Sequence, residues 1–290
     1  MRRTMLFLPG NSPAILLNAD TLGSDSIILD LEDAVSPTEK DSARILVRNA
    51  IKYLNYKNCE IIVRINPLDT DYWKKDLDEI IPLKPDMIMP TKVSDADYVL
   101  TIDKYISELE AKYGMEQGSV KLIPLIETTL GIENAFNIAK SCPRVTAMFL
   151  GGEDLTAALH CKRTKEGNEI FYSRCRMVCA ARAAGIEVYD TPFTDVDDDE
   201  GLVKDAMFAK SLGFSGKASI SPRHVHAINK VFSPTEAEIE HAHAVMEAIE
   251  TAKAQGRGVI SLNGKMIDAP IVSRAKQVLE MAAAINGGAN

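Results

Sequence analysis

The sequence predicts an α/β protein, a (β/α)8 TIM barrel followed by a C-terminal helical extension. Eight short apolar runs rich in β-branched residues alternate with segments of helical pattern, which is typical of parallel strands joined by crossover helices. All eight units fall within the first ~230 residues, close to the ~250 residues of a typical (β/α)8 barrel. An open doubly wound sheet usually needs fewer units, so the closed barrel is favoured.

The eight predicted strands come in regular order along the chain. They are residues 5–8, 26–31, 60–65, 87–89, 121–126, 145–150, 187–189 and 216–220. Ser12-Pro13 and Ser36-Pro37 place proline near the first turn of a helix, and Thr128 follows a strand where a helix N-cap is needed. These positions support the predicted sequence of strands and helices.

A second region begins after the eighth unit. Ser233-Pro234-Thr235-Glu236 resembles a helix start and opens a helical run to about residue 255. Gly256-Arg257-Gly258 then breaks the pattern, Asn263-Gly264 predicts a turn, and a last helix begins near Pro270. We therefore predict a barrel domain over residues 1–232 and a helical extension over residues 233–290.

The net charge and the cysteines indicate which partners and which cellular location to expect. The 33 Lys and Arg residues against 41 Asp and Glu give a net charge of −8, which disfavours nucleic acid and anionic membranes as general partners. Five cysteines, odd in number and without CxxC spacing, are typical of reduced cytosolic thiols. The apolar run at residues 5–8 is too short for a signal peptide, and no stretch reaches the ~18 apolar residues of a membrane helix. We expect a cytoplasmic protein.

Polar motifs end five successive predicted strands. They are residues 29–33 (LDLED), 64–67 (RINP), 90–92 (PTK), 126–128 (IET) and 151–154 (GGED). The active site of a (β/α)8 barrel lies at the carboxyl ends of its strands, so these motifs predict a charged site at one rim. Its candidate carboxylates are Glu32, Asp33, Glu127, Glu153 and Asp154, and its candidate cations are Arg64 and Lys92.

This excess of carboxylates predicts a metal site. Unpaired charges at an apolar edge cost several kcal/mol, and a divalent cation is the simplest compensation. Oxygen ligands without His or Cys favour Mg²⁺, which commonly takes one or two carboxylates and completes its shell with water and substrate. Glu127 and Asp154, on neighbouring strands, are the predicted ligands.

Other interpretations of these residues stay open. Any single acid could be a helix N-cap or a first-turn residue favoured by the helix dipole. Glu32 and Glu153 could point away, because strand residues alternate between faces. Lys92 could form a Schiff base with a carbonyl substrate, as in an aldolase, but surrounding carboxylates favour its protonated form.

Six segments of the chain carry a family resemblance. They are residues 5–13 (MLFLPGNSP), 29–35 (LDLEDAV), 63–67 (VRINP), 126–131 (IETTLG), 151–155 (GGEDL) and 263–270 (NGKMIDAP). In this order, and over essentially the whole chain, they resemble the family of the citrate lyase β subunit and the malyl-CoA and citramalyl-CoA lyases. The resemblance implies a (β/α)8 barrel that is usually trimeric. It also implies Mg²⁺ bound by the carboxylates that match Glu127 and Asp154, the two ligands predicted above.

The resemblance implies further residue roles. The arginine matching Arg64 binds the oxo-acid part of the substrate, and the aspartate matching Asp268 acts in catalysis from a neighbouring subunit's C-terminal lid. Without the resemblance, Asp268 would be interpreted as the N-terminal cap of the last helix. Ser221 is a departure, since many members carry Ile-His-Pro where this chain has Ile220-Ser221-Pro222. Any family role of that histidine is therefore not expected here.

The function predicted on this basis is a Mg²⁺-dependent carbon–carbon lyase. Its expected substrate is a 3-hydroxy-3-carboxyacyl thioester, foremost citryl thioester on acyl carrier protein or CoA, cleaved to oxaloacetate and an acetyl thioester. Glu32, Asp33 and Lys92 are expected to join Arg64 and Glu127 in substrate binding. A homotrimer, within or outside a citrate lyase complex, is expected. The alternatives are a stand-alone citramalyl-CoA or malyl-CoA lyase, and a catalytically silent scaffold subunit.

Overall fold

The chain divides into two compact units. The computed structural model describes residues 1–254, 261–262 and 265–287. One unit comprises residues 2–230, and the other comprises residues 231–290 together with Met1. Among the described residues, no helix combines the length and the apolar character that crossing a membrane requires.

Nine parallel strands form the framework of the larger unit. They are β1 (Thr4–Pro9), β2 (Ser26–Asp30), β3 (Glu60–Ile65), β4 (Met87–Pro90), β5 (Lys121–Leu122), β6 (Leu125–Ile126), β7 (Ala147–Leu150), β8 (Glu187–Asp190) and β9 (Gly216–Ser219). Their hydrogen-bonded order is β5-β4-β3-β2-β1-β9-β8-β7-β6. The first and last strands of this order, β5 and β6, are consecutive in the sequence.

The segment from β5 to β6 joins the two edges of the sheet. Ile123 N–H donates to Ile88 O of β4 at 3.0 Å, while Phe149 N–H of β7 donates to Pro124 O at 3.0 Å. The nine strands therefore close into a ring, which confirms the predicted (β/α)8 barrel. The fifth predicted strand is divided in two at Pro124, a residue that has no N–H to donate.

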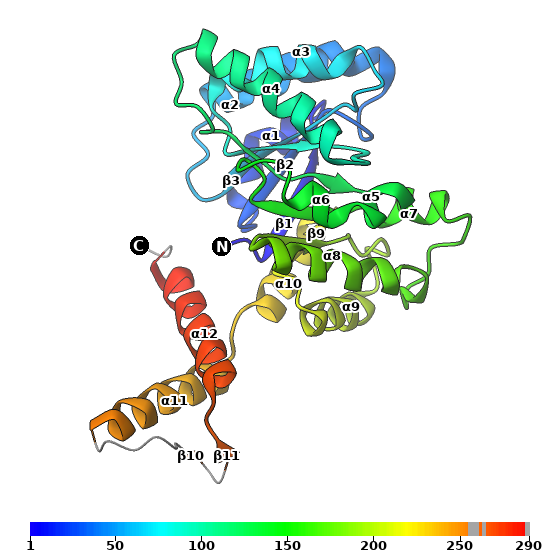
Figure 1. Cartoon of the computed structure of the whole chain (residues 1–290). Coiled ribbons are helices and arrows are strands. Elements are labelled where there is room, and N and C mark those ends of the chain that lie inside the picture. Colours follow the sequence, from blue (N-terminus) through cyan, green and yellow to red (C-terminus); the bar gives the residue numbers. More distant parts are fainter. Residues whose placement is uncertain (255–260, 263–264, 288–290) are drawn as a thin grey trace. The chain divides into compact units, whose positions relative to one another are not determined.

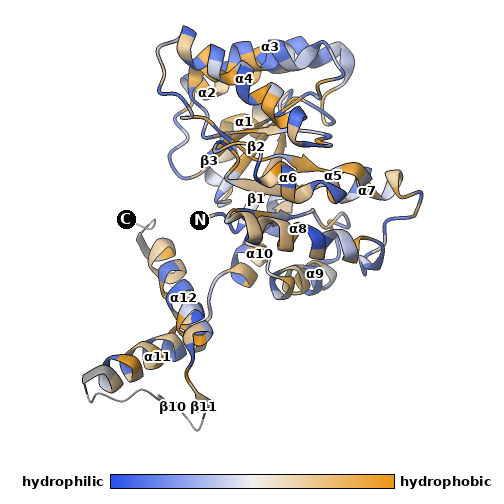
Figure 2. Cartoon of the chain, viewed as in Figure 1, coloured by the Kyte–Doolittle hydropathy of each residue, from blue (hydrophilic) through white to orange (hydrophobic). Residues whose placement is uncertain are grey.

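Helices connect the strands and cover the barrel. They are α1 (Pro13–Asn18), α2 (Lys40–Tyr53), α3 (Tyr72–Ile80), α4 (Ala96–Lys112), α5 (Thr129–Glu133), α6 (Ala135–Ala139), α7 (Gly152–Ala158), α8 (Phe171–Ala184), α9 (Asp199–Leu212) and α10 (Val225–Phe232). In Figure 1, α2, α3 and α4 lie on one side of the strands and α8 and α9 on the other. In Figure 2, α3 and α9 combine hydrophilic and hydrophobic residues, as expected of helices with one face on the barrel and one in solvent.

Local signals in the sequence explain where these helices begin. Thr128 is the N-cap of α5, and its hydroxyl accepts from Gly131 N–H at 3.0 Å, as predicted. Asp95 caps α4 by accepting from Tyr98 N–H at 2.9 Å. Ser12 and Ser36 both precede a helical proline, although neither side chain makes a cap hydrogen bond.

The barrel interior is filled by alternate residues of the strands. This core cluster contains Met5, Ile28, Ile62, Met87, Met89, Ile123, Leu125, Ala147, Phe149, Tyr189 and Ala218. Successive strand residues point to opposite faces, so the residue two positions after an inward-facing one also points inward. The alternation that places these residues in the core therefore also determines which side chains reach the carboxyl-terminal rim.

A cluster of four charges is buried within the same unit. Lys217 Nζ lies 2.6 Å from Asp190 Oδ2 and 2.6 Å from Asp205 Oδ2. Arg174 Nη2 lies 2.9 Å from Asp190 Oδ2 and 2.7 Å from Asp205 Oδ1. None of the four side chains is more than 3% exposed. The two cations and two carboxylates compensate each other, which buried charges require.

The C-terminal unit is built on two helices. Its elements are α11 (Glu236–Ala254), the antiparallel strands β10 (Ser261–Leu262) and β11 (Lys265–Met266), and α12 (Ala269–Gly287). Thr235 and Glu238 form a capping box at the start of α11, close to the predicted helix start. The two helices pack through Ala242, Val245, Ile249 and Ala275. The predicted break at residues 256–258 and turn at residues 263–264 lie outside the described residues.

Candidate active site

A cavity of about 390 Å³ lies at the carboxyl ends of the strands. Many of the residues that line it come two positions after an inward-facing core residue. Among them are Phe7, Asp30, Arg64, Glu127, Gly151, Thr191 and Ile220. The same alternation that fills the barrel thus delivers these residues to one rim, as the strand-end motifs predict.

Asp30 holds Arg64 in place at the cavity. Arg64 Nε donates to Asp30 Oδ1 at 2.7 Å, and Arg64 Nη1 lies 3.2 Å from Glu32 Oε2. The guanidinium also lies over the Phe7 ring, 4.9 Å from its centroid. Burial lowers the pKa of Arg64, but Asp30, Glu32 and Asp33 outweigh it and the pKa is raised. Arg64 is therefore a fixed, permanently charged group at the cavity.

Glu127 is the most deeply buried acid of the predicted ligand pair. Only 5% of the residue is exposed, and its Oε1 accepts from the backbone N–H of Lys92 at 2.8 Å. Burial, together with the charge of Asp154, raises the pKa of Glu127 to about 8, although the hydrogen bond from Lys92 lowers it. Without a compensating cation, this carboxylate is costly to ionise.

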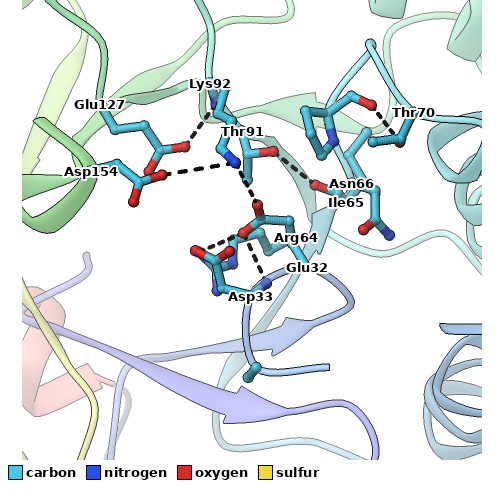
Figure 3. Close-up of polar contacts among 12 residues, drawn as sticks. Glu32, Asp33, Arg64, Ile65, Asn66, Thr70, Thr91, Lys92, Glu127 and Asp154 are labelled. Atoms are coloured by element: carbon cyan, nitrogen blue, oxygen red, sulfur yellow. Dashed lines mark hydrogen bonds and ion pairs between the residues drawn. The ribbon is translucent and has the colours of Figure 1, made fainter. Parts of the chain in front are cut away.

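Lys92 lies between the acids of the site (Figure 3). Its Nζ is 3.5 Å from Glu32 Oε1 and 3.9 Å from Asp154 Oδ2. Burial lowers the pKa of Lys92, but Glu32, Asp154 and the other nearby carboxylates outweigh it and leave the pKa raised. A protonated ammonium cannot attack a carbonyl, so this environment disfavours Schiff-base chemistry. The backbone of Lys92 has a φ of +54°, a left-handed conformation that is costly for a non-glycine residue.

The carboxylates of Glu127 and Asp154 fit a hard divalent cation. Both line the same cavity, and the charge of Asp154 raises the pKa of Glu127. A Cβ at Gly151 would lie 2.7 Å from Glu127 Oε2, so glycine leaves the space that this oxygen occupies. No group of three or more His, Cys, Asp or Glu side chains is arranged for a metal within the described part of the chain. Two carboxylates with water and substrate suffice for Mg²⁺.

Comparison with known proteins identifies the family. The sequence model of the HpcH/HpaI aldolase/citrate lyase family matches residues 3–222. The chain is 44% identical to the citrate lyase subunit beta of Haemophilus influenzae over 97% of both chains. It is 33% identical to the L-malyl-CoA/beta-methylmalyl-CoA lyase of Rhodobacter capsulatus, over 97% of this chain and 95% of the other. The chain belongs to the HpcH/HpaI aldolase/citrate lyase family.

A solved structure of this family superposes over nearly the whole chain. It is the protein CitE of Mycobacterium tuberculosis in complex with magnesium, acetoacetate and coenzyme A. The TM-score is 0.78 at 26% identity, over 97% of this chain and 98% of the other. The family membership and the relatives' activities confirm the prediction that this protein is a lyase.

The remaining predicted residues occupy different places. Glu32 is buried and turned toward Arg64 and Lys92, so the open possibility that it points away is wrong. Asp33 lines the cavity but is more than half exposed. Glu153 also lines the cavity and is exposed, and its carboxylate lies 3.5 Å from Arg163 Nε.

Asp268 and Ser221 both act as helix caps in the structure. Asp268 belongs to the C-terminal unit, and its Oδ1 accepts from Ile271 N–H at 3.1 Å at the start of α12. This confirms the cap predicted from the sequence alone. Ser221 Oγ accepts from Arg223 N–H at 3.3 Å and caps the short 3-10 helix Pro222–His224. Serine therefore fits this turn after β9.

Asp30 and Thr191 belong to the site but were not among the residues predicted from the sequence. Asp30 is almost fully buried and orients Arg64, and Thr191 lines the cavity beside the start of α7. The alternation of strand residues could have indicated both. Asp30 lies two positions after the core residue Ile28, and Thr191 lies two positions after the core residue Tyr189.

Proposed function

We propose that this protein cleaves the carbon–carbon bond of a citryl thioester in a Mg²⁺-dependent reaction, giving oxaloacetate and an acetyl thioester. The convergence of Glu127, Asp154 and Arg64 on one cavity carries this proposal. The 44% identity to a citrate lyase subunit beta over almost the full length supports the choice of substrate. The solved relative that holds magnesium and coenzyme A supports the metal and the thioester class.

Each residue of the site has a role in this reaction. Glu127 and Asp154 would hold the cation, which supplies Lewis acidity to the hydroxyl and carboxylate oxygens of the substrate. Arg64, charged and fixed by Asp30, would bind a carboxylate of the hydroxy acid. Lys92 and Glu32 would set the charge of the surrounding wall, and Asp33 would contact substrate at the cavity entrance.

In the proposed cleavage, the substrate loses one proton and the product takes up one. The substrate hydroxyl gives its proton to solvent as the carbonyl of oxaloacetate forms, and the electron pair of the broken bond passes to the acetyl thioester as an enolate. The enolate carbon must then take up one proton. We propose that Asp268 of a neighbouring copy supplies it, acting as a general acid on a lid that excludes water. A homotrimer is proposed because it would bring that residue to the site.

The carrier and the location complete the proposal. We propose acyl carrier protein as the thioester carrier within a citrate lyase complex, with CoA as the alternative carrier, in the cytoplasm. A net charge of −8 is consistent with a protein that binds neither nucleic acid nor membrane surface.

A substrate panel tests the proposed reaction. Purified protein with Mg²⁺ is given citryl, citramalyl and malyl thioesters, each on CoA and on acyl carrier protein, and the released oxo acid is measured. We expect citryl thioester to have the highest kcat/KM. Higher kcat/KM for malyl or citramalyl thioester would identify a stand-alone lyase of those substrates. Absence of cleavage together with absence of Mg²⁺ binding would indicate a scaffold subunit.

The raised pKa of Glu127 predicts a pH-dependent metal affinity. A cation binds the carboxylate form and must displace the proton below a pKa of about 8. We expect the Mg²⁺ affinity to rise by up to roughly tenfold per pH unit toward pH 8 and to level off above it. Calorimetric titration at several pH values measures the affinity, and buffers of different ionisation enthalpy measure the released proton. An affinity and a proton release that do not change with pH would contradict the assignment of Glu127.

The raised pKa of Glu127 also makes the stability of the metal-free protein depend on pH. The folded-state pKa of about 8 exceeds the ordinary value of 4.5, so between these values the folded protein keeps a proton that the unfolded chain has lost. The contribution of Glu127 to the free energy of unfolding therefore falls as the pH rises through this window. Glu127→Gln, which holds no titrating proton, serves as the matched control.

A further inference from the structure

Helix α7, which carries Asp154 in its first turn, lacks a cap from its own N-terminal residue. The N-cap is Gly151, which has no side chain, and the helix begins at Gly152. A helix start normally satisfies its free N–H groups with the side chain of the N-cap residue. Here the oxygen comes from another strand, because Thr191 Oγ1 accepts from Gly152 N–H at 2.9 Å.

Gly152 and Thr191 are in close contact, with no room for a side chain at position 152. A Cβ at Gly152 would lie 2.7 Å from Thr191 Oγ1 and 3.1 Å from its Cγ2. Only glycine therefore lets the first turn of α7 approach Thr191 this closely. Thr191 itself is 1% exposed, so its hydroxyl is the buried acceptor on which Gly152 N–H depends.

Thr191 is in turn held by the buried charge cluster. Lys217 Nζ donates to the Thr191 carbonyl oxygen at 2.7 Å and to Asp190 Oδ2 at 2.6 Å. A fully buried, paired lysine has little freedom, so the backbone of Thr191 is fixed at the end of β8. A continuous set of contacts thus runs from the cluster, through Thr191, to the turn that bears Asp154.

We infer that Thr191 is a positioning residue for the cation, because its hydroxyl fixes the first turn of α7 and with it the carboxylate of Asp154. This inference rests on the proposed function. Groups behind metal ligands typically change metal affinity by about 10- to 100-fold when they are removed. Thr191 makes its contact through the backbone of the ligand-bearing turn and does not need to touch the cation.

The test compares variants of Thr191 by calorimetric titration of the metal-free protein with Mg²⁺. Thr191→Val keeps the shape but removes the acceptor of Gly152 N–H, and we expect its Kd for Mg²⁺ to rise about tenfold. Thr191→Ser keeps the hydroxyl, and its Kd should stay within about twofold of the wild-type value. If the valine variant does not fold, Thr191→Ala removes the same hydroxyl without added bulk.

Thr4→Val is the matched control. Thr4 is a fully buried threonine at the start of β1, at the opposite end of the strands, and its hydroxyl donates to Asn229 Oδ1 at 2.7 Å. The Thr4→Val variant should be less stable than the wild type but should have the same Mg²⁺ affinity. Unchanged Mg²⁺ affinity in Thr191→Val, or an equal loss in Thr4→Val, would overturn the inference while leaving the proposed function intact. Wild-type protein that does not bind Mg²⁺ would overturn both.

Discussion

Asp154→Ala is expected to abolish Mg²⁺ binding and to lower turnover by roughly a thousandfold or more. The substitution removes one of the two proposed carboxylate ligands and leaves the buried Glu127 without its partner. Loss of a Lewis acid removes several kcal/mol of transition-state stabilisation, which corresponds to a rate loss of this size. Calorimetric titration with Mg²⁺ and steady-state kinetics on the best thioester of the panel measure the two effects.

Two other acids serve as controls for this result. Glu153 directly precedes Asp154 but pairs with Arg163, so Glu153→Ala should keep Mg²⁺ affinity close to that of the wild type. Asp268→Ala should lower kcat while leaving Mg²⁺ affinity nearly intact, because Asp268 is proposed as a proton donor and not as a ligand. Equal loss of metal in Asp154→Ala and Asp268→Ala would refute these assignments.

Lys217→Met is expected to destabilise the protein by about 3–5 kcal/mol. The side chain is fully buried, and its removal leaves Asp190 and Asp205 with only Arg174 as a counter-charge. An uncompensated buried carboxylate costs far more than the hydrophobic side chain recovers. The midpoint of urea unfolding, followed by circular dichroism at constant metal concentration, measures the effect.

A more exposed ion pair provides the comparison for Lys217. Arg48 Nη1 lies 2.8 Å from Glu79 Oε2, with both side chains more than a third exposed. Arg48→Met should therefore change the free energy of unfolding by at most about 1 kcal/mol. If Lys217→Met were no more destabilising than Arg48→Met, the buried cluster would not stabilise the fold as the geometry indicates.

The barrel could be predicted because its strands are short, largely apolar and mostly buried. Each predicted strand corresponds to an observed one within a few residues, and only the break at Pro124 was not anticipated. The rim acids followed from the same pattern, since charged residues directly after such strands must lie at the carboxyl ends. Glu127, Asp154 and Arg64 therefore come together as expected on one cavity.

Other features depend on contacts between distant segments. Arg174 and Asp205 lie on helices, and nothing in their local sequence indicates that they meet Asp190 and Lys217 inside the fold. The left-handed backbone of Lys92 is equally hidden, because lysine gives no local signal for a positive φ. For Asp268 the cap is readable from the sequence, whereas the proposed catalytic role depends on another copy of the chain.

The strand order has a consequence for how the protein is made in the cell. β1 pairs with β2 on one side and with β9 on the other, so the first strand of the barrel finds its second neighbour only in the last strand of the barrel. Until residue 219 has been synthesised, one edge of β1 stays unpaired and open to other chains. Ring closure is thus a late, long-range step of biosynthesis, when the nascent chain is most exposed to aggregation.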